Sequence, residues 1–284
     1  MKVISTIEGM QNHSDLLKSK GKSISFVPTM GALHEGHLEL VRKAKEIAHY
    51  CIVSIFVNPL QFGPHEDFTK YPRPIEEDIA KCKSIGADCL FIPETEDLYP
   101  DGFSTAVTVG VVTEKFEGVS RTSHFQGVTT VVTKLLLATK PTIVLFGQKD
   151  FQQVLVLRKL IRDLNFGIQI EMVPTKRDSD GLALSSRNKY LTSEDRESAL
   201  YIRKALLEGK NYIESGEKRR KIINAAMLLI LRSTSAIHID YVSSAIANTL
   251  EEPESFESGE VIVLLVASFV GKTRLIDNEI VRIP

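Results

Sequence analysis

Two histidines separated by two residues are the side chains best suited to act on a phosphate group. His34 and His37 lie in the stretch Pro-Thr-Met-Gly-Ala-Leu-His-Glu-Gly-His, which spans residues 28–37. Three residues apart, the two imidazoles share one face of a helical turn. Their ring N–H groups can donate to phosphate oxygens and to the charge that develops as pyrophosphate leaves. Gly31 and Gly36 allow the backbone to approach such a ligand closely.

The same stretch departs from two other kinds of site. Gly31 and Gly36 have the spacing of a Walker loop, but His37 and Leu38 stand where that loop needs Lys and Ser or Thr. A histidine pair could ligate a metal, but no third ligand is evident nearby, so the metal ligands stay unassigned. A helix that begins near His37 would offer free N–H groups to a phosphate. His-x-Gly-His between a strand and a helix resembles the nucleotidyltransferase superfamily, which includes class I aminoacyl-tRNA synthetases and small adenylyl- and cytidylyltransferases.

Two further polar segments follow predicted strands. Gln61 lies in a loop after the strand that ends at Val57, and its amide can both donate to and accept from a hydroxyl or carboxylate. Lys149 follows the strand that ends at Phe146 and would place a positive charge beside phosphates. Asp150 is either a helix N-cap or part of an ATP site, and Gln153 lies one turn further on.

Polar residues also cluster between two predicted domains. Ser185, Ser186 and Arg187 offer two hydroxyls and a guanidinium, which are good phosphate donors. This segment is either a loop that closes over ATP or an ordinary linker. The stretch 121–127 either contacts a ligand or only starts the helix that follows.

The arrangement of these segments requires alternating strands and helices. Residues 1–175 predict a Rossmann-like, doubly wound α/β domain with a parallel sheet, in which ligands bind beyond the carboxyl ends of the strands. Residues 176–284 predict a smaller α+β domain. The expected strands of the first domain are Ser23–Val27, ended by Pro28, then Ile52–Val57, Cys89–Ile92, Thr142–Phe146 and Ile168–Val173. The expected helices between them are Leu38–Ala48, Ile75–Ile85, Val128–Ala138 and Phe151–Leu164. The second domain should hold helices near 194–214 and 217–233, with strands His238–Ser243, Val261–Phe269 and Arg274–Ile280.

Composition restricts the function classes. The 35 basic and 36 acidic residues give a formal net charge of −1, which disfavours nucleic acid as a partner. No apolar run reaches the ~20 residues that span a bilayer. The N-terminus lacks the apolar core of a secretion signal, so we expect a cytoplasmic protein. Cys51, Cys82 and Cys89 form no Cys-x-x-Cys pair, so neither a disulfide framework nor a zinc site is indicated. Cys51 and Cys89 each open an apolar run, and we expect them to be small buried residues.

Taken together, these segments resemble the pantothenate synthetases. The resemblance rests on six stretches that occur in the family's order and span almost the whole chain: 28–37, 57–64, 71–73, 146–150, 185–188 and 274–278. It implies an ATP-dependent ligase that uses magnesium and forms a homodimer. Pantoate would attack the α-phosphate of ATP to give pantoyl adenylate and pyrophosphate, and the β-alanine amine would then displace AMP.

The resemblance also implies residue roles. His37, His34 and Lys149 would be catalytic, and Gln61 and Gln153 would bind pantoate and β-alanine. The residues implied in ATP binding are Met30, Gly31, Ala32, Leu33, His34, Glu35, Gly36, His37, Gly147, Gln148, Lys149, Asp150, Lys176, Leu184, Ser185, Ser186 and Arg187.

Four positions differ from the family's usual residues. Thr122 and Ser123 replace Pro and Gly, Lys176 replaces an apolar residue, and Leu184 replaces Met or Lys. Two other hypotheses stay open. A different small nucleotidyltransferase would share the histidines without needing the other loops, and a non-catalytic nucleotide sensor would need only a phosphate loop. The short chain and balanced charge disfavour a tRNA synthetase.

Overall fold

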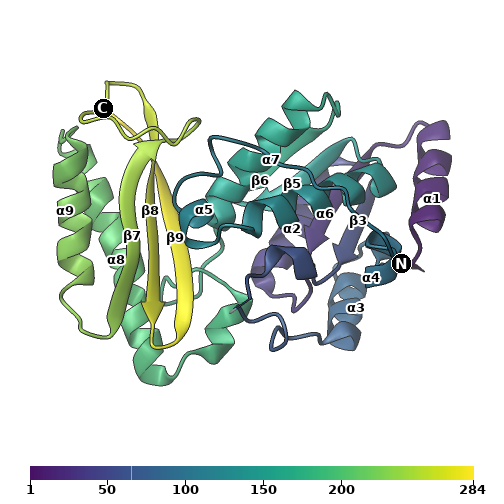
Figure 1. Cartoon of the computed structure of the whole chain (residues 1–284), viewed down its shortest axis with the longest axis horizontal. Coiled ribbons are helices and arrows are strands. Elements are labelled where there is room, and N and C mark those ends of the chain that lie inside the picture. The colour runs from purple at the N-terminus through teal and green to yellow at the C-terminus, as the bar shows by residue number, and fades with distance from the viewer. Residues whose placement is uncertain (65) are drawn as a thin grey trace. The chain divides into compact units, whose positions relative to one another are not determined.

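The structure, a computed structural model, describes residues 1–64 and 66–284 (Figure 1). The chain forms two compact units. The first contains residues 1–148 and 152–174, and the second contains residues 149–151 and 175–284. Each unit has its own hydrophobic core. Among the described residues, no helix combines the length and apolar character needed to cross a membrane.

The first unit is built on a six-stranded parallel sheet in the order β1-β4-β3-β2-β5-β6. The strands are β1 (Lys2–Ile4), β2 (Ile24–Thr29), β3 (Tyr50–Ile55), β4 (Cys89–Phe91), β5 (Ile143–Gly147) and β6 (Gln169–Val173). From β2 the chain builds outward through β3 and β4, and it then returns to place β5 on the other side of β2. The strand order therefore reverses between β2 and β5, which is where such sheets bind ligands. The predicted Rossmann-like fold is confirmed.

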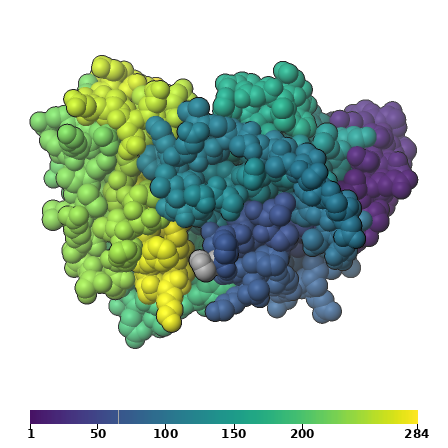
Figure 2. All heavy atoms as spheres, viewed as in Figure 1, coloured from purple at the N-terminus to yellow at the C-terminus, as the bar shows by residue number. Residues whose placement is uncertain are grey.

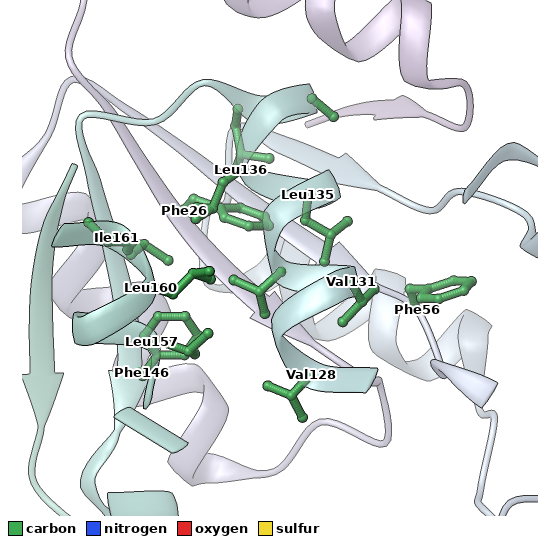
Figure 3. Packing of buried hydrophobic residues seen from close by; sticks show 14 of the residues in the cluster. Phe26, Phe56, Val128, Val131, Leu135, Leu136, Phe146, Leu157, Leu160 and Ile161 are labelled. Atoms are coloured by element: carbon green, nitrogen blue, oxygen red, sulfur yellow. The ribbon is translucent and has the colours of Figure 1, made fainter. Parts of the chain in front are cut away.

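Helices cover both faces of this sheet. They are α1 (Ile7–Ser19), α2 (Glu35–Ile47), α3 (Ile75–Ser84), α4 (Thr95–Leu98), α5 (Glu117–Ser120), α6 (His124–Thr139) and α7 (Phe151–Asp163), with the 3-10 turns η1 (Pro59–Gln61) and η2 (Gln148–Asp150). Phe26 of β2 and Phe146 of β5 pack with Val131 of α6 and Leu157 of α7 (Figure 3). Val27, one residue after Phe26, packs on the opposite face with residues of α2 and α3. Successive side chains point to opposite faces of a strand, so one strand supplies both cores.

The cysteines are structural. Cys51, Cys82 and Cys89 are all buried free thiols. Burial raises the pKa of Cys51 to about 12 and those of Cys82 and Cys89 to about 11. At neutral pH they are protonated and poor nucleophiles, as the sequence predicted for Cys51 and Cys89.

The structure differs from the prediction in two places. The sequence analysis predicted neither β1 nor α1. β1 has only three residues, and its partner strand is distant in the chain, with Lys2 paired to Cys89. The strand expected to end at Pro28 continues through it to Thr29. Phe56 N donates to Thr29 O, so Thr29 faces β3 and Pro28 faces the β5 side. The β2–β5 pairing already ends at Phe26, so the missing N–H of Pro28 breaks no ladder bond.

The second unit is α+β, as predicted. Its antiparallel sheet has the order β7-β8-β9, with β7 (Ile237–Ile246), β8 (Val261–Val270) and β9 (Thr273–Arg282). The helices are α8 (Ser193–Glu214) and α9 (Arg220–Leu231), preceded by the 3-10 turn η3 (Ser186–Tyr190). Thr192 and Asp195 form a capping box at the start of α8, as their spacing of three residues at a predicted helix start indicates. A Cβ at Gly209 of α8 would lie 2.8 Å from Met227 of α9, so this glycine permits close helix packing.

Candidate active site

The two histidines form the N-terminal cap of α2. His34 is the N-cap, so the helix begins at Glu35 rather than near His37. His34 Nδ1 accepts from Gly36 N at 3.2 Å, and His37 Nδ1 accepts from His34 N at 3.3 Å. The ring centroids are 4.0 Å apart. Because each Nδ1 is an acceptor, the proton of each neutral imidazole is on Nε2.

A buried carboxylate holds the turn that leads into this cap. Asp78 of α3 is 1% exposed. Its Oδ2 accepts from Ala32 N at 2.7 Å and its Oδ1 accepts from Leu33 N at 2.8 Å. One turn along α3, Lys81 Nζ donates to Leu33 O at 2.8 Å. The turn needs this support because Gly31 and Ala32 both have positive φ, 79° and 50°, which is costly for alanine.

A second buried network fixes Gln61. Asn58 is 1% exposed, and its Nδ2 donates to Gln61 Oε1 and to Gly127 O, both at 3.1 Å. Asn58 Oδ1 accepts from Tyr99 Oη at 2.7 Å and from Leu60 N at 3.3 Å. The amide of Asn58 is therefore fully hydrogen-bonded.

The orientation of Gln61 follows from that network. Its Oε1 is bound to Asn58, and its Nε2 lies 2.9 Å from Met30 Sδ. Met30 directly follows β2. The Gln61 loop after β3 and the histidine turn after β2 therefore meet at one edge of the sheet.

The stretch 121–127 supports the Gln61 loop. His124 Nδ1 donates to Gln61 O at 3.0 Å, so its Nε2 accepts from Arg121 at 3.1 Å. Burial and the nearby Arg121 guanidinium lower the pKa of His124 to about 4, which keeps it neutral. Arg121 also forms a bidentate pair with Glu66 at 2.7 Å. Ser123 has φ −95°, so the position where the family usually has glycine needs none.

The end of β5 faces the same switch point. Gly147 ends the strand, Gln148 follows, and a Cβ added at Gly147 would meet nothing within 4 Å. On α7, Gln153 is half-buried. Its neighbour Gln152 is 4% exposed, and its amide bonds to Glu117 N and to two carbonyls of the 112–115 loop. Gln152 therefore has a structural role, because its amide holds the 112–117 segment in place. The long loop between α4 and α5 lies at the surface of this unit (Figure 2).

The remaining predicted residues belong to the second unit. Lys149 Nζ lies 3.5 Å from Asp150 Oδ1, and Asn278 Nδ2 of β9 donates to Lys149 O at 2.9 Å. Asp150 is exposed and lies in a 3-10 turn.

Hydrogen bonds within the chain hold the polar loop of this unit, residues 176–187. Leu184 N donates to Lys176 O at 3.0 Å, and Ser185 caps η3 by accepting from Arg187 N at 3.2 Å. Arg177 forms a bidentate pair with the buried Asp277 at 2.6 and 3.0 Å. Lys176 itself is exposed. Ser185, Ser186 and Arg187 are consecutive at the start of η3.

Comparison with known proteins identifies the family. The sequence profile described as pantoate–β-alanine ligase matches residues 2–280. A pantothenate synthetase of Moorella thermoacetica is 47% identical over 283 residues, which is 100% of this chain and 99% of that protein. The chain belongs to the pantoate–β-alanine ligase family. Ligases of this family join pantoate to β-alanine.

Solved structures of the family share the fold. The pantothenate synthetase of Thermus thermophilus is 40% identical and superposes with a TM-score of 0.91, covering 98% of this chain and 99% of that one. The pantoate–β-alanine ligase of Francisella tularensis, complexed with β,γ-ATP and β-alanine, is 35% identical with a TM-score of 0.80, covering 98% and 97%.

Within the first unit the structure brings together the ligase residues predicted after β2 and β3. Met30 to His34 form the turn between β2 and α2, His37 lies in the first turn of α2, and Gln61 contacts the turn through Met30. Gly147 and Gln148 lie at the end of β5, beside β2 in the sheet.

Sequence reasoning did not predict the roles of four supporting residues. From the sequence, Lys81 and Tyr99 have no predicted role, Asn58 indicates only a turn cap, and Asp78 is a possible metal ligand or a residue that supports the site from behind, with no spacing that decides between them. In the structure these four hold the turn and the Gln61 loop. Only the contacts that these residues make in the folded chain identify their role, and no spacing in the sequence reveals those contacts.

Proposed function

We propose that this protein ligates pantoate and β-alanine to pantothenate through a pantoyl adenylate. In the first step, a pantoate carboxylate oxygen attacks the α-phosphorus of ATP and the bond to the β-phosphate oxygen breaks, which releases pyrophosphate. In the second, the β-alanine amine attacks the acyl carbon, and AMP leaves with the former carboxylate oxygen. The observation that carries the proposal is the capped His34–His37 turn at the strand-order switch point, in a chain of the ligase family.

In the proposed first step, His34 and His37 donate through Nε2–H to the phosphates. Their Nδ1 atoms are bound to the backbone, so the rings are oriented before ATP arrives, which is the arrangement that stabilises developing charge best. Met30 to Gly36, Gly147 and Gln148 line the nucleotide through backbone groups. Lys149 is positioned through its carbonyl by Asn278 and bridges phosphates, with Asp150 beside it.

Pantoate binds to Gln61 and Gln153 in this proposal, and Gln61 also meets β-alanine. Lys176 and Leu184 contact the nucleotide, and Ser185, Ser186 and Arg187 bind phosphates. We propose that residues 1–175 form the nucleotide- and pantoate-binding domain and that residues 176–284 close over ATP. The acyl adenylate hydrolyses in water, which gives closure a purpose.

Magnesium enters the proposal as the partner of ATP. In residues 1–64 and 66–284 no three His, Cys, Asp or Glu side chains are grouped as a metal site, and both oxygens of Asp78 are bound to backbone N–H groups. The protein therefore offers no cage of its own in that part of the chain. Magnesium commonly binds substrate phosphates and water with few protein ligands, and that arrangement fits here. We also propose a cytoplasmic homodimer.

The test is pyrophosphate exchange into ATP, with magnesium and without β-alanine. We expect exchange only when pantoate is added, because pantoate is the acceptor of the adenylyl group. Exchange that needs no pantoate, or none at all from a folded protein that binds ATP, would reject the first step. The result would then favour another nucleotidyltransferase reaction or a nucleotide sensor.

His37→Ala tests the histidine's role. The exchange rate should fall by at least about 10²-fold, the usual cost of removing a donor to a transition-state charge. Folding should persist, because the capping bond that His37 accepts is one of several at the helix start. Near-normal exchange by folded His37→Ala protein would contradict the mechanism.

A further inference from the structure

The amide of Gln61 has a fixed direction in the structure, although a glutamine can in principle donate and accept. Its Oε1 receives Asn58 Nδ2 at 3.1 Å. Only Nε2 is then directed toward Met30, whose sulfur is a weak acceptor. An oxygen of a carboxylate or hydroxyl is a much better acceptor than a thioether. Gln61 is therefore prepared to donate to a substrate oxygen through Nε2.

This direction depends on how Asn58 is held. Two backbone groups set which end of its amide faces which way, because Gly127 O can only accept and Leu60 N can only donate. The contact with Leu60 is long, at 3.3 Å. The shortest of the four bonds, at 2.7 Å, comes from the hydroxyl of Tyr99. This is the ordinary length of an O–H···O hydrogen bond, and it completes the four bonds that hold the Asn58 amide.

Tyr99 is itself well placed to act as a fixed donor. Its ring lies between Phe103, 5.1 Å away and edge-on, and Phe56, 6.1 Å away. Burial raises the pKa of Tyr99, so the hydroxyl keeps its proton at neutral pH. Tyr99 lies just after α4, and it donates its one hydroxyl proton to Asn58 rather than to Gln61.

We propose that Tyr99 is a positioning residue: through Asn58 it holds Gln61 as a hydrogen-bond donor to an acceptor oxygen of pantoate. The inference rests on the proposed function, since it assumes that Gln61 binds pantoate. It adds that a tyrosine hydroxyl that does not touch the substrate helps to hold the Asn58 amide, whose orientation the two backbone groups set.

Tyr99→Phe removes the hydroxyl and keeps the ring packing. The KM for pantoate should rise about tenfold, the size expected from losing one buried hydrogen bond, while the KM for ATP stays within about twofold. Tyr50→Phe is the matched control. It removes another part-buried tyrosine hydroxyl, bound to His13 at 2.9 Å, at the opposite end of β3. Its effect should be confined to thermal stability.

A second measurement separates positioning from general loosening. Pantoate binding is titrated by calorimetry in the presence of a non-hydrolysable ATP analogue, in wild type, Tyr99→Phe, Gln61→Met and the double variant. If Tyr99 acts through Gln61, Tyr99→Phe weakens pantoate binding in the wild-type background and has no further effect with Met at position 61.

Three outcomes would overturn the inference: an unchanged KM for pantoate in Tyr99→Phe, equal rises for pantoate and ATP, or additive effects in the double variant. Kinetics are measured at a temperature where melting curves show every variant folded. Failure of the proposed function gives a different result, because wild type would then show no pantoate-dependent exchange.

Discussion

Replacing Asp78 by asparagine tests whether the carboxylate beneath the β2–α2 turn positions His34 and His37, the proposed catalytic residues. Both oxygens of Asp78 accept backbone N–H groups, at 2.7 and 2.8 Å. Asparagine has nearly the same shape but only one oxygen. Its NH₂ group must face the N–H of either Ala32 or Leu33, so two donors would meet in a buried site.

The magnitude follows from these two bonds. A hydrogen bond to a charged group contributes about 1.5–3 kcal/mol, and a buried donor left unsatisfied costs a similar amount. The variant loses one such bond and weakens the other, so we expect it to be about 2–4 kcal/mol less stable. The turn should also shift away from Asp78. Misplacement of a catalytic group by about 1 Å can cost 10²-fold in rate, so kcat/KM for ATP should fall by at least about tenfold.

Glu77→Gln is the matched control, because it removes the neighbouring carboxylate on the same helix. The Glu77 side chain is 70% exposed, and its ion pair with Lys81 is 3.8 Å long. Such pairs contribute little. Urea unfolding measures the stability of both variants, and pyrophosphate exchange measures their activity. If Asp78→Asn matched Glu77→Gln within about 0.5 kcal/mol and kept its activity, the positioning role would be refuted.

Three further predictions concern other supports of the site. Gly127→Ala should destabilise the protein by about 1–3 kcal/mol and weaken pantoate binding, because the added Cβ would lie 2.2 Å from Leu60 O. Calorimetry measures both effects, with Gly110→Ala as the control, since a Cβ there would lie 3.9 Å from the nearest atom. His124 should make the protein acid-sensitive, because its pKa is about 4 in the folded state and about 6.5 in the unfolded state. Its contribution to the free energy of unfolding is fully present above pH 6.5 and falls by up to about 3 kcal/mol as the pH drops to 4. In urea unfolding, His124→Gln should reduce the loss of stability between about pH 6.5 and pH 4. Asp277→Asn should raise the KM for ATP and leave that for pantoate unchanged, because its partner Arg177 also donates to Gly181 O and so supports the loop of residues 176–187. Steady-state kinetics measures both values.

The sequence predicted those features that depend on neighbours in the chain. The pair His34–His37, the Thr192–Asp195 capping box and the alternating strands all arise from spacings of a few residues. Local patterns of that kind determine helix starts and strand faces. The helix start was misplaced by two residues because His34, and not a more common capping residue, is the N-cap.

The supports of the site could not be predicted in this way. Asp78 lies 45 residues from Leu33, and Tyr99 lies 41 residues from Asn58. Each contact exists only because parallel strands bring their carboxyl ends to one edge of the sheet. In the sequence alone, Asp78 looks like any first-turn acid of α3, beside Glu76 and Glu77. Only its burial distinguishes it.

The cap also restricts what the histidines can do. A neutral imidazole whose Nδ1 accepts a backbone N–H carries its proton on Nε2, and a protonated one also has a proton there. In either state His34 and His37 can only donate through Nε2. They are therefore unsuited to take a proton from pantoate, whose carboxylate needs no base to attack. The same geometry suits them to the pyrophosphate side, where charge accumulates on oxygen as the bond breaks.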